Sequence, residues 1–203
     1  MGPRPSCSAA AAGLTPASAW VLLTEPEPRS ADTGAGIAEA DERMPTKTAV
    51  FARLAQVTIA HFACHGSSHS TDPSQSLLLP HDWQHDPLTV ASLAPVNLDR
   101  ARLAYLSACS PALARTQQLL DESIHLTAAF QLAGFPHVID TLWQINDTHA
   151  ADIADTFSTH LTDNEENIDT GRAAHALHTT LRALRDRRPL TPALWAAHLH
   201  AGA

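Results

Sequence analysis

Three short apolar runs constrain the fold of this chain more than any other feature of its sequence. They read VTIAHFA, RLAYLS and HVIDTLW, and they occupy residues 57–63, 102–107 and 137–143. Their apolar residues follow one another instead of alternating with polar ones, which is typical of strands covered on both faces. Segments with helical patterns separate the runs. We therefore expect an α/β fold of βαβ units, with a mostly parallel sheet between two helical layers.

Capping and stop residues mark the expected helices. Gly134 is placed to end the helix before the third strand, because glycine adopts the left-handed backbone that closes a helix. Asn146 or Asp147 is placed to cap the helix that follows this strand. Residues 110–118 have no clear period and are expected to form a loop. The expected helices cover residues 47–55, 121–132, a segment that ends near 161, 172–186 and 192–200.

Length and composition favour one globular domain. The chain has 203 residues, of which 44% are hydrophobic and 17% are charged, and this is enough to bury the core of one α/β domain. Residues 1–45 are rich in Pro, Ala, Ser and Gly, and we interpret them as a poorly ordered or incomplete N-terminal segment. Within it, only residues 19–24 (AWVLLT) have a strand-like pattern. The folded domain is therefore expected over residues 46–203.

Charge and cysteine content disfavour several classes of function. The net charge of −8 argues against binding to nucleic acid or to an anionic membrane. No apolar run reaches the roughly 18 residues that a membrane span needs. The three cysteines, Cys7, Cys64 and Cys109, include no CxxC pair and have no regular spacing. They do not look like a disulfide framework, so a reducing cytoplasm is the expected location.

Two reactive side chains follow the first and second apolar runs. His65 comes two residues after the run 57–63, and Cys109 comes two residues after the run 102–107. In an open parallel sheet both emerge at the carboxyl edge, where ligands bind. A histidine within hydrogen-bond reach activates a cysteine as a nucleophile, and Gly66 lets the backbone turn and offer an N–H to an oxyanion. On spacing alone, two ordinary residues at strand ends fit equally well.

Other polar residues of the first strand have structural interpretations. Cys64 is expected to pack in the core, because strand side chains alternate and it points away from His65. His61 is interpreted as a buried histidine bonded to the backbone. A zinc site is disfavoured, because His61 and Cys64 cannot easily converge with His65 on one ion. No metal and no cofactor is therefore expected.

Several further motifs resemble those of one family. The segments HFACHG, SLLL, YLSAC, DESIHLTAAFQLAGFPHVIDTLW, IND and ALWAAHLHAG occur in this order. They closely resemble the CHAT family of caspase-like cysteine peptidases, which are related to separase, over roughly residues 46–203. The resemblance implies a caspase-haemoglobinase-like fold, a three-layer α/β/α sandwich with a mostly parallel central sheet. It also implies a dyad of His65 and Cys109, with Gly66 at the oxyanion hole.

The resemblance also implies residues that recognise the substrate. Separase-like relatives carry a tryptophan-containing strand that leads to an acidic residue for a basic P1 side chain, and this pattern falls on Trp143 and Asp147. A carboxylate pairs with arginine through two hydrogen bonds, so cleavage after Arg or Lys is expected. The alternative is that Asp147 only caps its helix. Ser76 and Trp143 are placed to line the cleft, although a strand-initiating turn and a core position explain them as well.

The sequence thus predicts a cysteine endopeptidase that acts on a protein substrate and is regulated by a partner protein or an attached domain. Two other functions stay open: an inactive caspase-like interaction or signalling module, and an acyl-transfer enzyme that acts on small molecules. Two departures from the family pattern favour the inactive module. Residues 1–45 supply less than the usual first strand and helix. Asp140 lies in the third strand, where a buried unpaired carboxylate would cost on the order of several kcal/mol.

Overall fold

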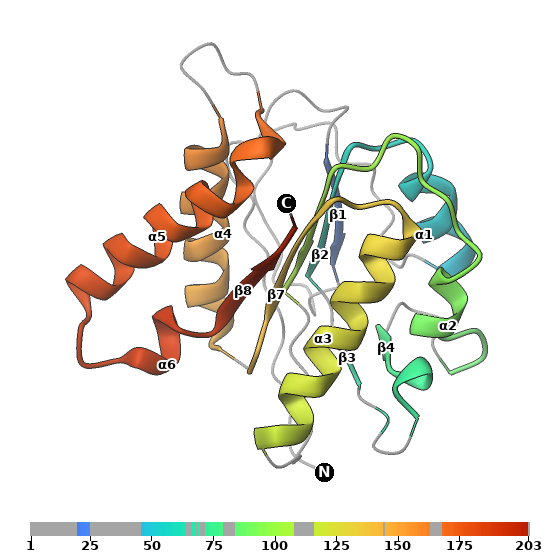
Figure 1. Ribbon diagram of the computed structural model, residues 1–203, viewed down its shortest axis with the longest axis horizontal. Helices are drawn as coiled ribbons and strands as arrows, with labels where there is room; N and C mark the ends of the chain where they lie inside the picture. The colour runs from blue at the N-terminus through green and yellow to red at the C-terminus, as the bar shows by residue number, and fades with distance from the viewer. Residues whose placement is uncertain are drawn as a thin grey trace, which may run out of the picture.

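A five-stranded sheet lies at the centre of the molecule (Figure 1). The computed structural model describes residues 20–24, 46–63, 66–67, 69, 72–78, 84–107, 116–143, 145–162 and 168–202. In spatial order, the strands are β1 (Trp20–Thr24), β2 (Ile59–Ala63), β6 (Leu103–Leu106), β7 (His137–Thr141) and β8 (His198–Ala201). The first four strands run parallel, and β8 runs antiparallel to β7. The mostly parallel sheet expected from the apolar runs is confirmed.

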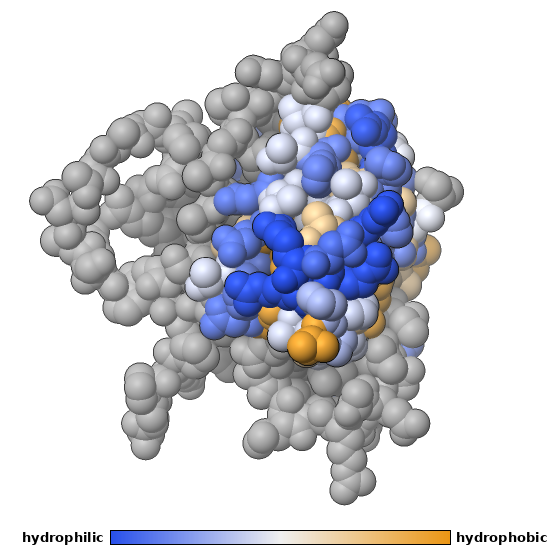
Figure 2. All heavy atoms as spheres, turned by 90° about the vertical axis from the view of Figure 1, so that its left-hand side faces the viewer, coloured by the Kyte–Doolittle hydropathy of each residue, from blue (hydrophilic) through white to orange (hydrophobic). Residues whose placement is uncertain are grey.

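Helices cover both faces of this sheet (Figure 1). The helices on one face are α1 (Lys47–Leu54), α2 (Val90–Leu93) and α3 (Thr116–Ala133). Those on the other are α4 (Asp147–Leu161), α5 (Ala173–Arg187) and the short α6 (Pro192–Trp195). Two short 3₁₀ helices, Pro73–Gln75 and Thr170–Arg172, lie in the connections. The side of the molecule that carries α5 is mostly hydrophilic (Figure 2), as expected of a layer that faces water. The three-layer α/β/α arrangement is thus confirmed.

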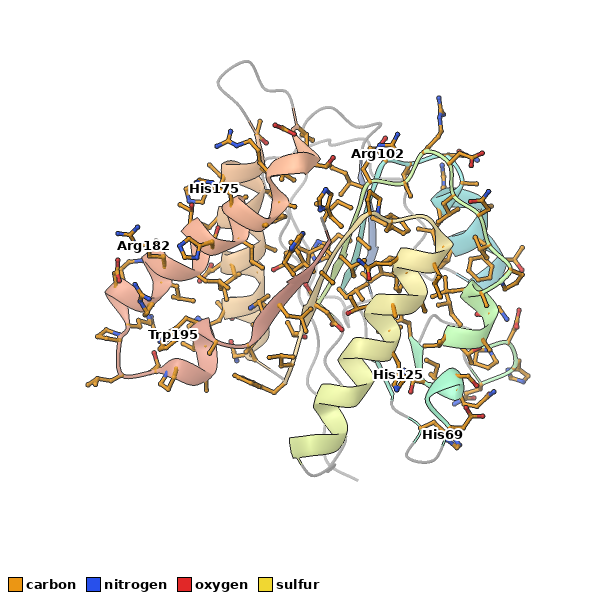
Figure 3. The ribbon with its side chains drawn as sticks, in the orientation of Figure 1. His69, Arg102, His125, His175, Arg182 and Trp195 are labelled. Carbon is orange, nitrogen blue, oxygen red and sulfur yellow. The ribbon has the colours of Figure 1, made fainter. Side chains whose placement is uncertain are left out.

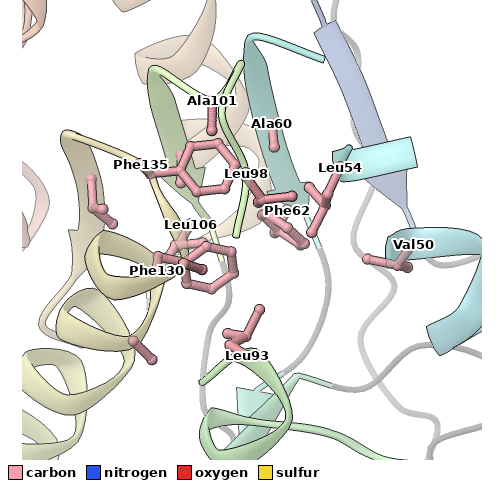
Figure 4. Packing of buried hydrophobic residues seen from close by; sticks show 14 of the residues in the cluster. Val50, Leu54, Ala60, Phe62, Leu93, Leu98, Ala101, Leu106, Phe130 and Phe135 are labelled. Atoms are coloured by element: carbon pink, nitrogen blue, oxygen red, sulfur yellow. The ribbon is translucent and has the colours of Figure 1, made fainter. Parts of the chain in front are cut away.

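Successive side chains of each central strand enter two different apolar clusters. Phe62 of β2 lies in the cluster under α1 and α3, where its ring meets Phe130 edge-on with centroids 4.9 Å apart (Figure 4). Ile59 of the same strand lies in the opposite cluster, under α4 and α5, with Tyr105 and Phe157. Burying a side chain of this size contributes roughly 1.5–3 kcal/mol. The strands read as continuous apolar runs because both of their faces are buried.

Helix ends follow the capping residues that the sequence marks. The Thr46 side chain accepts the backbone N–H of the first turn of α1, and Asn146 Oδ1 accepts the N–H of Thr148 at 3.0 Å. Gly134 follows the last residue of α3 with φ of +123°, and a Cβ there would lie 2.6 Å from the carbonyl oxygen of Leu98. The predicted glycine stop is therefore confirmed, and its reason includes this close approach as well as the backbone conformation.

Two helix predictions are wrong. The expected final helix over 192–200 ends at Trp195 as α6, and the residues from His198 onward form β8. These residues pair with β7, whose edge offers backbone partners that a local pattern cannot reveal. The helix expected from 121 begins at Thr116, so the end of the expected 110–118 loop is helical.

The strand-like residues near the N-terminus belong to the central sheet. The five residues of β1 pair in parallel with all five residues of β2, at the edge of the sheet away from β8. The rest of residues 1–45 lies outside the described residues. Among the helices that are described, none is both long and apolar enough to cross a membrane.

Candidate functional site

The carboxyl ends of β2 and β6 lie side by side, because these strands are parallel neighbours. Their register pairs Ile59 with Leu103 and Phe62 with Leu106, so paired residues are 44 positions apart in sequence. One further backbone hydrogen bond continues the ladder past β6, from the N–H of Ser107 to the carbonyl oxygen of Phe62 at 2.9 Å. The segments that follow β2 and β6 therefore begin next to each other, at the edge where parallel sheets bind ligands.

The predicted dyad follows these two strand ends. His65 and Cys109 lie outside the described residues, as does Cys64. In sequence, His65 and Cys109 are separated by the same 44 positions as every pair in the ladder. Each residue comes three positions after the last ladder pair, Phe62 and Leu106. The offset between the two predicted residues is therefore the same as the offset between the paired strands.

Gly66 opens a second, smaller sheet directly after the position of His65. This sheet has the order β3 (Gly66–Ser67), β4 (Leu77–Leu78) and β5 (Leu88–Thr89), and all its neighbours are antiparallel. The ladder pairs Gly66 with Leu78. The backbone that leaves β2 is thus held again by a ladder within a few residues.

Ser76 lies directly before β4 and bonds to backbone groups that flank the smaller sheet. Its side chain is buried, with 5% of its surface exposed. The hydroxyl oxygen accepts the backbone N–H of His69 at 3.2 Å, and the Ser76 carbonyl accepts the N–H of Val90 at 2.9 Å. These contacts explain a serine just before β4, and its predicted contact with substrate stays a prediction.

Trp143 and Asp147 both follow β7, the third strand of the same edge. The Trp143 indole N–H donates to the carbonyl oxygen of Ala193 at 2.8 Å, and its ring packs on a cluster that contains Ile153. Asp147 is the first residue of α4, and the capping residue is Asn146. The alternative that Asp147 caps this helix is therefore wrong.

His61 is bonded to a side chain and not to the backbone as expected. Its Nε2 lies 2.8 Å from Ser107 Oγ, and its ring meets Tyr105 edge-on with centroids 4.9 Å apart. Burial lowers the pKa of His61 to about 4, so the imidazole is neutral near pH 7. The sequence pattern alone assigns no role to Ser107. The register of the two strands does: Tyr105 is the ladder partner of His61, and Ser107 is two positions further on the same face.

Asp140 is buried as expected, but its carboxylate is hydrogen-bonded. The side chain is 2% exposed. One oxygen accepts the backbone N–H of Thr141 at 2.7 Å, and the other lies 3.5 Å from the hydroxyl of Thr127 on α3. The cost foreseen for an unpaired carboxylate therefore does not arise.

Histidines of the described elements are spread over different parts of the fold. His125 lies on α3 and His175 on α5, on opposite sides of the sheet (Figure 3). His137 and His200 pair between β7 and β8, with Nδ1 and Nε2 3.2 Å apart. In the described part of the chain, no three His, Cys, Asp or Glu side chains come together as metal ligands.

Comparison with known protein families supports this placement of the elements. Residues 21–203 match the family described as the CHAT domain. The match covers most of the chain and spans from β1 to β8. No curated protein matches the chain.

Proposed function

The chain belongs to the CHAT domain family, which is caspase-like and often peptidase-related, and on this premise we propose that it is a cysteine endopeptidase. His65 takes the proton of the Cys109 thiol or stabilises its thiolate. The Cys109 sulfur attacks the carbonyl carbon of the scissile peptide bond. The backbone N–H groups of Gly66 and Cys109 bind the oxyanion that forms. The tetrahedral intermediate then collapses: the C–N bond breaks, and the departing amine takes the proton from His65, which leaves the acyl-enzyme. Water attacks the thioester carbonyl, releases the carboxylic acid product and regenerates the thiol.

The register of β2 and β6 carries this proposal. Every described pair of the ladder is 44 positions apart, and so are His65 and Cys109. Two parallel strands in register bring residues at equal positions along the ladder to the same height, and this ladder ends three residues before each member of the dyad. A dyad requires a nucleophile and a base within about 3 Å of each other, and this equality of positions favours such a pair over two unrelated strand-end residues.

The path of the chain after β2 supports the role of Gly66. The small sheet β3-β4-β5 holds the backbone at Gly66 by its pairing with Leu78. An oxyanion hole is effective when its donors are fixed before the reaction, because no reorganisation is then required during it. A ladder residue directly after the general base satisfies this requirement better than a residue in a free loop.

The expected preference for Arg or Lys at P1 rests on Asp147. Since Asn146 caps α4, helix capping does not account for an aspartate at 147. A carboxylate there receives a guanidinium through charge-assisted hydrogen bonds. Trp143 would form part of the pocket wall, and Ser76 would contribute to the cleft by holding β4. The substrate would be a protein met in a reducing cytoplasm, and a partner protein or attached domain would regulate the cleavage.

Peptide cleavage tests the proposal. Fluorogenic peptides with Arg, Lys or Asp at P1 are incubated with the unmodified chain, with Cys109→Ala and with Cys64→Ala. We expect turnover that Cys109→Ala abolishes and that Cys64→Ala retains, because only Cys109 is the nucleophile. An acyloxymethyl ketone should label Cys109 alone.

Background-level turnover in all three proteins, with no labelling of Cys109, would rule out the peptidase. The inactive interaction module would then be the better description of this chain.

A further inference from the structure

One side-chain hydrogen bond joins the two strand ends from which the proposed dyad follows. His61 lies on β2, four residues before His65, and Ser107 lies directly after β6, two residues before Cys109. The His61 Nε2 and the Ser107 Oγ are 2.8 Å apart. The bond therefore links the two segments at their exit from the sheet.

The surroundings of His61 fix its ring and keep it uncharged. The imidazole meets the Tyr105 ring edge-on, at an interplanar angle of 69°. Tyr105 in turn packs against Phe157 of α4, with centroids 5.3 Å apart. Burial lowers the pKa of His61 to about 4, and a neutral imidazole has one donor and one acceptor nitrogen. The His61 Nε2 can therefore either donate to or accept from the Ser107 hydroxyl, and it places no net charge next to the proposed dyad.

Backbone hydrogen bonds between β2 and β6 stop near the ends of these strands. The described ladder between β2 and β6 ends at Phe62 and Leu106, with the bond from Ser107 N–H as its last rung. The His61–Ser107 bond adds a second, side-chain link at the same level, on the face of the sheet covered by α4. Catalytic geometry is sensitive to displacements of about 1 Å, so a link at the base of both arms has a large effect on how the arms meet.

We infer that His61 and Ser107 are positioning residues for the proposed dyad, and that their hydrogen bond sets the separation of the arms that carry His65 and Cys109. This inference rests on the proposed function. Neither residue touches the substrate. Their loss should therefore reduce turnover and thiolate formation at Cys109 while leaving peptide binding nearly unchanged.

Four variants separate positioning from general stability. Ser107→Ala removes the hydroxyl, and His61→Phe keeps a ring against Tyr105 but removes both nitrogens. His61→Gln restores a neutral group that donates and accepts. Ser158→Ala is the matched control, because the Ser158 hydroxyl also makes a 2.8 Å hydrogen bond, to the carbonyl oxygen of Ala154 in α4.

Two readouts are measured for each variant beside the thermal midpoint. The first is kcat and KM for the fluorogenic peptide. The second is the pH dependence of Cys109 alkylation by iodoacetamide, followed by peptide mass mapping. In Ser107→Ala and His61→Phe we expect kcat to fall about tenfold, with KM within about twofold. The alkylation inflection should rise toward the ordinary cysteine pKa of about 8.5. His61→Gln should recover most of the kcat and most of the shift in the alkylation inflection. The variant that combines Ser107→Ala with His61→Phe should have a kcat no lower than either single variant.

The outcomes distinguish the inference from the proposed function. If Ser107→Ala and His61→Phe keep the kcat and inflection of Ser158→Ala, the positioning role is wrong although the peptidase stands. If no variant cleaves peptide but the inflection still shifts, the peptidase is wrong and the positioning role stands. Background-level turnover together with an inflection near 8.5 in the unmodified chain would overturn both, because there would be no activated thiol to position.

Discussion

At the scale of single residues, two polar side chains of the central strands are satisfied by hydrogen bonds. His61 is bonded to Ser107, and Asp140 is bonded to the N–H of Thr141. Each bond prevents the loss of free energy that an unpaired buried polar group would cause, which is about 1–3 kcal/mol. Bonds of this kind also fix the direction in which the backbone leaves the sheet. The proposed chemistry therefore depends also on residues such as His61 and Ser107, which do not contact the substrate.

Asp147 allows a prediction at this scale. Asp147→Asn removes the charge that would bind a basic P1 side chain. We expect kcat/KM for peptides with Arg at P1 to fall about 10- to 100-fold, because a charge-assisted hydrogen bond is worth roughly 1.5–3 kcal/mol. Cleavage of all P1 variants is compared by fluorescence. Asp152→Asn, an exposed position further along α4, is the control and should change little. Equal losses for Arg and Asp peptides would contradict the pocket role.

At the scale of elements, β8 is the strand that depends most on its surroundings. It is an edge strand, and all four of its residues are only partly buried. Beside its ladder with β7, the rings of His137 and His200 stack with centroids 5.4 Å apart. Gly202 closes this corner, because a Cβ there would lie 2.6 Å from the carbonyl oxygen of Pro136.

A substitution at Gly202 tests how this strand is held. Gly202 has φ of +155°, and a Cβ would also lie 2.7 Å from His137 Nδ1. We expect Gly202→Ala to lower the free energy of unfolding by about 2 kcal/mol. Hydrogen exchange should show that protection is lost in β8 and retained in β2 and β6.

Gly171→Ala is the matched control, since its Cβ would meet only a side-chain oxygen, of the exposed Asp169, at 3.2 Å. An unchanged exchange pattern in Gly202→Ala would show that the close approach is relieved without moving the strand.

At the scale of the whole molecule, stability should depend on pH through two partly buried histidines. Burial lowers the pKa of both His61 and His198 to about 4, from an ordinary value of 6.5. Above pH 6.5 both are neutral in the folded and the unfolded chain. Between pH 6.5 and 4 the unfolded chain binds protons that the folded chain does not, so the free energy of unfolding falls as the pH falls. Below about pH 4 the loss is complete.

Urea denaturation at a series of pH values measures this dependence. One pKa unit corresponds to about 1.4 kcal/mol, so the two histidines together account for a loss on the order of several kcal/mol. His61→Phe should remove part of the slope between pH 6.5 and 4. His175→Gln, an exposed position on α5, should leave the slope unchanged. A His61→Phe slope equal to that of the unmodified chain would contradict the role of burial.

By itself, the sequence determined the three apolar strands, the two helical layers around them and the stop at Gly134. Continuous apolar runs must be buried on both faces, and helix ends need local partners, so these features depend on near neighbours. Only the tertiary structure decided that β8 is a strand, because its backbone groups find their partners on β7, about 60 residues earlier. The same holds for His61 and Ser107, which are joined through the register of β2 and β6. That register is also the part of the candidate site that the sequence could not supply, since a strand pattern does not state which strand lies beside it or at what offset.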